Sequence, residues 1–289
     1  MPETAPSQSP KWDIEIQPQT RLFDWNLREV WRYRDLMWML VRRDFVSIYK
    51  QTILGPLWFL IQPLLTTGMY FLIFSRIARL STDGVPPTLF YLAGITCWGY
   101  FQESLLRISD TFITNSNIFG KVYFPRIVIP VSVVISNFVR FFIQLFLFLL
   151  VWTYYLIFTD IHIQPNWILF PMLPVLMLMM AGLALGLGML ISSLTTKYRD
   201  LRFLLTFGVQ LLMFATPVVY PLSISSESLK PFLLINPITA IVETFRSIFL
   251  GTGTWSWGAL GYSFSCMVAL LLLGIMVFNR VEKKFMDTV

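Results

Sequence analysis

Charged residues inside apolar stretches are the first candidates for chemistry in this sequence. Arg140 is the only charged residue between positions 127 and 158. A guanidinium facing lipid is costly, so Arg140 should point into the protein, toward a polar neighbour or toward head groups. Glu103, near the end of another apolar stretch, is a candidate partner.

A second charged pair lies closer to the C-terminus. Glu243 and Arg246 are spaced i, i+3, which places them on one face of a helix. We expect a local ion pair that stabilises its own segment rather than a direct contact with a ligand.

The residues that membrane-embedded enzymes need do not occur at useful spacing. The only histidine, His162, has no carboxylate or cysteine at a spacing useful for catalysis or metal binding, and Cys97 and Cys266 fall inside separate apolar segments. The glycine-rich phosphate loop of many ATP-binding proteins does not occur either. We therefore expect no catalytic residue, no metal site and no cofactor in this chain. An ion-coupled carrier stays open, although Glu103 and Glu243 lie near span ends rather than at mid-membrane.

The composition indicates what must position these residues. Apolar residues make up 56% of the chain and charged residues 13%, and the mean hydropathy is +0.66. These values are outside the usual range of soluble domains of this length. Whole stretches of about twenty residues carry no charge, which is typical of membrane-spanning helices. We therefore expect an integral membrane protein.

The apolar stretches predict an all-α fold with six transmembrane helices in a domain of residues 51–280. The predicted spans cover about residues 51–75, 88–106, 127–158, 167–194, 203–220 and 255–279. Gly182, Gly186 and Gly188 give the fourth span a small-residue face, which favours close helix packing.

Four segments lie outside these spans. Residues 1–27 are expected to form a loosely structured arm, and residues 28–50 an amphipathic interfacial helix. Residues 224–252, interrupted by Asn236 and Pro237, are predicted to form short re-entrant or interfacial helices before the sixth span. Residues 281–289 form a short tail.

The distribution of basic residues predicts the orientation, because cytoplasmic loops carry an excess of Lys and Arg. The arm, the tail and the loops after the second and fourth spans hold most of them. The opposite side keeps only Arg76, Arg79, Lys230 and Arg246. Both termini are therefore expected in the cytoplasm.

Five strings in register resemble the permeases of O-antigen, capsule and teichoic-acid exporters. They are residues 49–58 (YKQTILGPLW) with Gln62-Pro63; Phe124-Pro125-Arg126 with Pro130; Tyr198-Arg199-Asp200; residues 216–221 (TPVVYP); and Asn236-Pro237 with Glu243, Arg246 and Gly251. The resemblance covers the chain from about Arg28 to the C-terminus.

This resemblance implies a type-two ABC exporter in a bacterial inner membrane that passes a lipid-linked, undecaprenyl-bound glycan outward. The chain would pair with itself and with two copies of an ATP-binding subunit, which would hold ATP and Mg. O-antigen is the first expectation for the cargo, and teichoic acid or capsule the second. Export of drugs or simple lipids, or a membrane-bound glycosyl or acyl transferase, remain alternatives. Membrane lipids are expected partners, and nucleic acid is not.

Within that family the first and fifth spans border the pore, where aromatic faces could stack on sugar rings while the glycan slides. The candidates for the glycan path are Trp58, Phe59, Tyr70, Phe71, Phe207, Phe214 and Tyr220. Lipid-facing or interfacial positions are the alternative for each. Arg140 is a candidate contact for the phosphate of the lipid carrier.

Movement of the ATP-binding partner would have to enter through cytoplasmic protrusions. The candidates for contact with it are Arg42, Arg43, Asp110, Asn115, Asn117, Lys121, Arg199 and Asp200. For Arg42 and Arg43, anchoring to anionic lipid head groups is the alternative.

Overall fold

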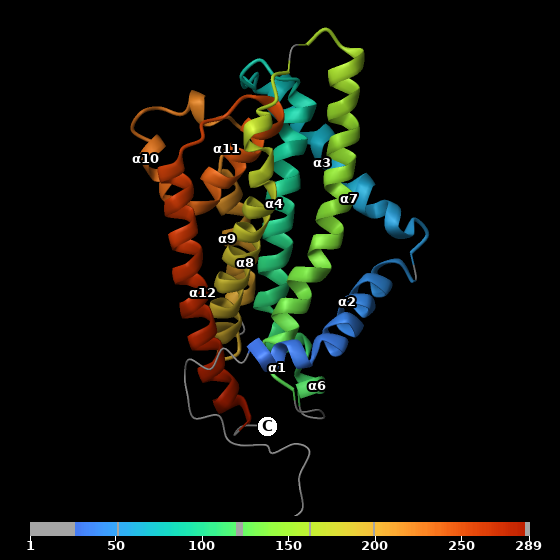
Figure 1. Cartoon of the computed structure of the whole chain (residues 1–289), viewed down its shortest axis with the longest axis vertical. Coiled ribbons are helices and arrows are strands. Elements are labelled where there is room, and N and C mark those ends of the chain that lie inside the picture. Colours follow the sequence, from blue (N-terminus) through green and yellow to red (C-terminus); the bar gives the residue numbers. More distant parts are fainter. Residues whose placement is uncertain (1–26, 51, 120–123, 162, 199, 287–289) are drawn as a thin grey trace, which may run out of the picture.

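The computed structural model of the chain describes residues 27–50, 52–119, 124–161, 163–198 and 200–286. These residues form helices and connecting loops, with no β-strand in the described ranges (Figure 1). The all-α class is thereby confirmed for this part of the chain.

Four helical segments are long and apolar enough to cross a bilayer: Gly55–Ile77, Val128–Phe158, Trp167–Thr195 and Trp257–Val281. The first comprises η1 (Gly55–Leu57), α3 (Trp58–Tyr70) and the π-helix η2 (Phe71–Ile77). The others are α7 (Val128–Phe158), η3 (Trp167–Met172) with α8 (Leu173–Thr195), and most of α12 (Trp257–Met286). They overlap the first, third, fourth and sixth predicted spans.

The central helix, α4 (Pro87–Ser109), is as long as the shortest of these segments but less apolar. It packs against α3, α7, α8 and α11. Thr96 and Ser104 are fully buried, whereas Glu103 is partly exposed. Because neighbouring helices cover most of α4, its buried polar side chains meet protein rather than lipid.

Helix α9 (Leu201–Phe214) is shorter than the predicted span of residues 203–220. Pro217 and Pro221 follow it, and proline disfavours a continued helix at its own position and at the residue before it. The segment of residues 215–221 is therefore a loop.

The packing of α8 on α12 depends on glycines in both helices. A Cβ added to Gly274 would lie 2.5 Å from the carbonyl oxygen of Gly186, and a Cβ on Gly186 would lie 2.6 Å from the backbone of Leu270. Gly182 also faces α12, at Met267, whereas Gly188 faces α4 at Ile108. Small residues thus let these backbones approach closely, as is common between membrane helices.

The bundle has two different ends (Figure 1). One end, called here the α2 end, holds α1 (Leu27–Arg32), α2 (Arg34–Tyr49), α5 (Thr111–Thr114), α6 (Ser116–Phe119) and the last turns of α12. The opposite end, called the α11 end, holds η4 (Leu222–Ile224), α10 (Lys230–Ile235) and α11 (Pro237–Leu250). Helices α10 and α11 lie within the predicted segment of residues 224–252.

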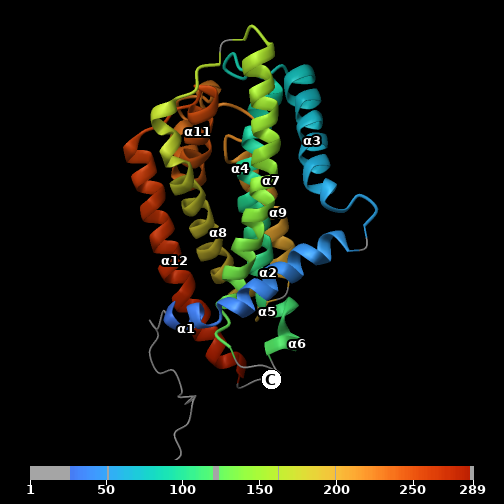
Figure 2. The ribbon, with the colours of Figure 1, turned by 45° about the vertical axis from the view of Figure 1, so that its right-hand side comes forward.

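Helix α2 runs obliquely across the bundle and packs against α7 (Figure 2). Leu40 and Val41 are buried in this contact, whereas Trp38 and Met39 point outward. The apolar side of α2 is therefore covered by protein, and its outer side carries exposed aromatic and basic residues.

Replacing Gly274 by Ala is expected to destabilise the α8–α12 contact by about 1 to 3 kcal/mol, because the new methyl group would overlap the Gly186 backbone. Gly261→Ala is the matched control on the same helix, since a Cβ there has open space, and it should be neutral or slightly stabilising. Thermal unfolding of the purified variants in detergent measures both. Equal midpoints for the two variants would contradict this packing.

Candidate functional site

Four helices enclose a cavity of about 340 Å³ that opens to the surface of the chain. The walls come from α3, α4, α7 and α9. Its volume is at the lower end of the roughly 300 to 1,000 Å³ typical of small-molecule sites. It is the candidate functional site because it combines aromatic, amide and charged side chains inside an apolar bundle.

Aromatic rings form part of every wall except that of α9. The rings are those of Phe59, Tyr70, Trp98, Tyr100 and Phe141. Tyr100 and Phe141 meet edge to face with centroids 5.5 Å apart, and the Tyr70 hydroxyl lies 3.3 Å from the Met213 sulfur. These contacts between helices hold the rings in fixed positions.

Each of the four helices also contributes one glutamine to the cavity. They are Gln62 from α3, Gln102 from α4, Gln144 from α7 and Gln210 from α9. The Trp98 indole donates to Gln102 Oε1 at 2.6 Å, which leaves the Gln102 amide nitrogen as a donor. Sequence reasoning gave these glutamines no role, although an amide inside an apolar span is itself a signal, since it needs a polar partner.

The charged part of the cavity centres on the Glu103 carboxylate. Arg140 Nη1 and Arg107 Nε each donate to Glu103 Oε1 at 2.6 Å. The Arg140 guanidinium also lies 5.3 Å from the centre of the Phe59 ring. Two guanidinium groups thus share one carboxylate, and the excess positive charge suits an anionic group such as a phosphate.

A second buried charge pair lies at the α11 end, outside this cavity. Arg246 donates to Glu243 Oε1 at 3.3 Å, and both side chains are almost fully buried. The guanidinium also donates to the backbone carbonyls of Pro217 and Val218 and lies 3.7 Å from the Phe90 ring centre. Glu243 Oε2 accepts from the Thr254 backbone at 3.0 Å. This pair joins α11, α4, the loop after α9 and the loop before α12, which is a structural role.

The structure brings some of the glycan-path candidates together and separates others. Phe59 and Tyr70 line the cavity, and so does Arg140, the candidate contact for the carrier phosphate. Trp58, Phe207 and Phe214 are exposed on α3 and α9. The centre of the Phe71 ring lies 5.2 Å from the guanidinium carbon of Arg76. Tyr220 follows α9 and donates through its hydroxyl to the Phe214 carbonyl.

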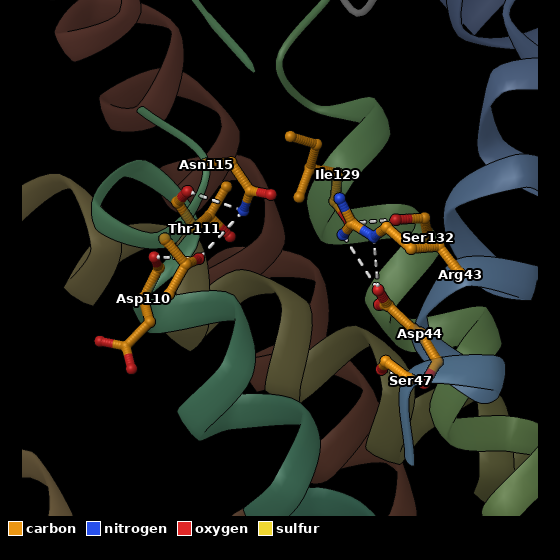
Figure 3. A network of polar contacts seen from close by, with 9 residues as sticks. Arg43, Asp44, Ser47, Asp110, Thr111, Asn115, Ile129 and Ser132 are labelled. Atoms are coloured by element: carbon orange, nitrogen blue, oxygen red, sulfur yellow. Dashed lines mark hydrogen bonds and ion pairs between the residues drawn. The ribbon is translucent and has the colours of Figure 1, made fainter. Parts of the chain in front are cut away.

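Figure 3 shows two polar groups among the partner-contact candidates at the α2 end. In one group, Arg43 donates to Asp44 at 2.9 Å beside α7. In the other, the buried Asn115, at the C-terminal end of α5, donates through its side-chain amide to the Thr111 carbonyl.

Other contact candidates lie nearby or outside the described residues. Asp110 pairs with Arg202 of α9 at 2.7 Å; burial raises the pKa of the Asp110 carboxyl, and the guanidinium partly offsets this. Arg42 and Asp200 are exposed. Lys121 and Arg199 fall outside the described residues, and the side chain of Asn117 is not described either.

Comparison with known proteins identifies similar chains. The family model described as ABC-2 type transporter matches residues 35–250. The O-antigen export system permease protein RfbA of Klebsiella pneumoniae is 26% identical over 258 residues, which cover 88% of this chain and 94% of that protein. The protein of the same name from Myxococcus xanthus is 31% identical over 227 residues, which cover 77% and 83% of the two chains.

Arg246→Met is expected to destabilise the fold by roughly 3 to 5 kcal/mol, because it leaves the Glu243 carboxylate buried without its cation. Lys230→Met is the matched control, since it breaks the exposed i, i+3 pair with Glu227 and should cost less than about 1 kcal/mol. Thermal unfolding in detergent compares the two. A control variant that unfolds as early as Arg246→Met would refute the structural role.

Proposed function

The chain belongs to the ABC-2 type transporter family, and from this premise we propose that it is the membrane-spanning subunit of an ATP-driven polysaccharide exporter. The cargo proposed is an undecaprenyl-linked glycan that moves from the cytoplasmic to the outer side of a bacterial inner membrane. O-antigen is the first choice, because that is the cargo named in the relatives' descriptions, and teichoic acid or capsule is the second.

The lining of the cavity is the observation that carries this proposal. A site for an apolar drug or simple lipid would be mostly hydrophobic with few polar groups. This cavity instead has a glutamine on every wall beside aromatic rings. Amides both donate and accept hydrogen bonds, as sugar hydroxyls do, and aromatic rings can cover the apolar faces of sugar rings.

The passage itself would run along the exposed faces of α3 and α9. These faces carry Trp58, Phe207 and Phe214 among aliphatic residues, and they also expose Gln62 and Gln210. An amide facing lipid is costly, so a shared aqueous passage between two copies of the chain suits these faces better. Phe71 and Tyr220, at the far ends of these helices, would extend this path.

In this proposal the chain crosses the membrane six times, with both termini in the cytoplasm. Helices α4 and α9 would add two crossings to the four apolar segments. The α2 end would be cytoplasmic, because it carries the basic residues Arg107, Arg126, Lys197 and Arg202, and cytoplasmic loops carry an excess of such residues. Helices α1 and α2 would then lie at the membrane surface, and α10 and α11 would enter from the outer side without crossing.

The working unit proposed is a homodimer with two ATP-binding subunits, which would hold ATP and Mg and perform the hydrolysis. Those subunits would dock at the α2 end, on the exposed Arg42, on α5 and α6, and on the segment around Arg199 and Asp200. The Asp110–Arg202 pair supports this site of coupling, because it connects α5 directly to α9, one wall of the cavity.

Removing the gene from its own bacterium is expected to abolish the surface polysaccharide and to leave lipid-linked glycan inside the cell. Gel analysis of surface glycan and mass spectrometry of the lipid fraction measure the two pools, and plasmid-borne chain should restore export. Unchanged surface glycan with a loss of drug or lipid efflux would overturn the proposed cargo. Lipid-linked glycan that lacks one sugar or acyl group would instead indicate a transferase.

Arg140 is proposed to contact the phosphate of the lipid carrier. Arg140→Gln should lower export by roughly tenfold or more, since it removes a charged hydrogen-bonding group, whereas Arg140→Lys should retain part of it. Lys230→Gln is the control, because Lys230 lies outside the cavity in an exposed pair with Glu227, and it should export as the wild type does. Surface glycan is compared at equal protein level. Normal export by Arg140→Gln would rule out a required charge.

A further inference from the structure

We propose that the cavity between α3, α4, α7 and α9 binds one neutral sugar residue of the passing glycan, with Gln144 as a specificity-determining residue. This inference rests on the proposed export function and adds a defined binding site within a single copy of the chain. The volume of about 340 Å³ suits a ligand of the size of one sugar ring rather than a longer oligosaccharide.

The first argument is the unmet hydrogen-bonding capacity of the lining. The side-chain amides of Gln62, Gln144 and Gln210 make no hydrogen bond within the described residues. Asn137 is 1% exposed; its Nδ2 donates to Ser104 Oγ at 3.0 Å, while its Oδ1 has no partner among the described residues. A buried polar atom normally has a partner, so Asn137 Oδ1 calls for a ligand or water. The exposed amides of Gln62 and Gln210 and the partly exposed amide of Gln144 can bind the same ligand.

The second argument is the kind of ligand that this lining selects. A phosphate only accepts hydrogen bonds, whereas a sugar hydroxyl both donates and accepts. The cavity offers both kinds of group, because the Gln102 amide nitrogen remains a donor and Asn137 Oδ1 remains an acceptor. A neutral hydroxylated ring therefore matches this part of the cavity better than an anion, which would be drawn to Arg140.

The third argument concerns how Gln144 is placed. Its Oε1 lies 3.6 Å from the position that a Cβ on Gly99 would occupy. The Gln144 amide from α7 therefore reaches the wall of α4 next to Trp98 and Tyr100, whose rings also line the cavity. A ligand in the cavity at this point of α4 would therefore have the Gln144 amide within reach.

The experiment measures binding of methyl glycosides of glucose, galactose, mannose and N-acetylglucosamine to the full chain in nanodiscs. Saturation-transfer-difference NMR suits the weak affinity that a sliding polymer requires. The wild-type chain is expected to bind at least one glycoside with a millimolar Kd. Gln144→Leu should raise that Kd by roughly three- to tenfold, as expected for one lost hydrogen bond.

Two further variants keep the test decisive. Gln164→Leu is the matched control, because Gln164 is exposed in the loop after α7 and does not line the cavity; it should bind as the wild type does. Gln62→Leu changes an exposed cavity residue and should weaken binding even if Gln144→Leu fails to fold. Size-exclusion chromatography of each variant checks folding.

Three results would overturn the inference: no binding of any glycoside, equal affinity in the cavity variants and the control, or tighter binding by Gln144→Leu. Export in cells separates this failure from that of the proposed function. A wild-type chain that exports glycan without binding a glycoside would refute the sugar site alone. A chain that neither binds a glycoside nor exports a glycan would refute both.

Discussion

The hydrocarbon core of a bilayer offers no hydrogen-bond partner, and this constraint explains most of the arrangement described here. Every polar side chain in the bundle must be covered by protein, paired with another polar group or wetted. The most polar of the long helices, α4, accordingly lies at the centre, with α3, α7, α8 and α11 around it. The polar side chains of α4 that face α3, α7 and α9 lie beside polar side chains of those helices, and together they line the cavity.

The same constraint explains the two charge clusters. Arg246 cannot be hydrated where it lies, so Glu243 and two backbone carbonyls surround it, and the loop after α9 is held in place as a result. Glu103 has a different environment, because it forms ion pairs with both Arg107 and Arg140 and lines the cavity. The first cluster has all its strong acceptors inside the chain and is suited to holding the fold. The second keeps an excess of positive charge beside the cavity and is suited to binding.

Much of this arrangement could be predicted from residue types. The long apolar runs in α7, α8 and α12 were sufficient for those helices, and the cost of an intramembrane charge was sufficient to pair Arg140 with Glu103. The central position of α4 was not predictable, because its moderate hydropathy does not reveal which neighbours cover it. The predicted span of residues 203–220 extends past the end of α9, because residues 215–220 are mostly apolar although Pro217 and Pro221 disfavour a continued helix. The glutamines of the cavity were missed because each lies in a different helix, and only the packing brings the four together.

Co-purification of the tagged full chain from its own bacterium, followed by an ATPase assay with and without the lipid-linked glycan, tests the central claim most directly. The account predicts a stable complex of two copies of the chain with two ATP-binding subunits, and ATP hydrolysis that rises when the glycan is added. A chain that purifies without any ATP-binding subunit and itself modifies a lipid-linked sugar would contradict it.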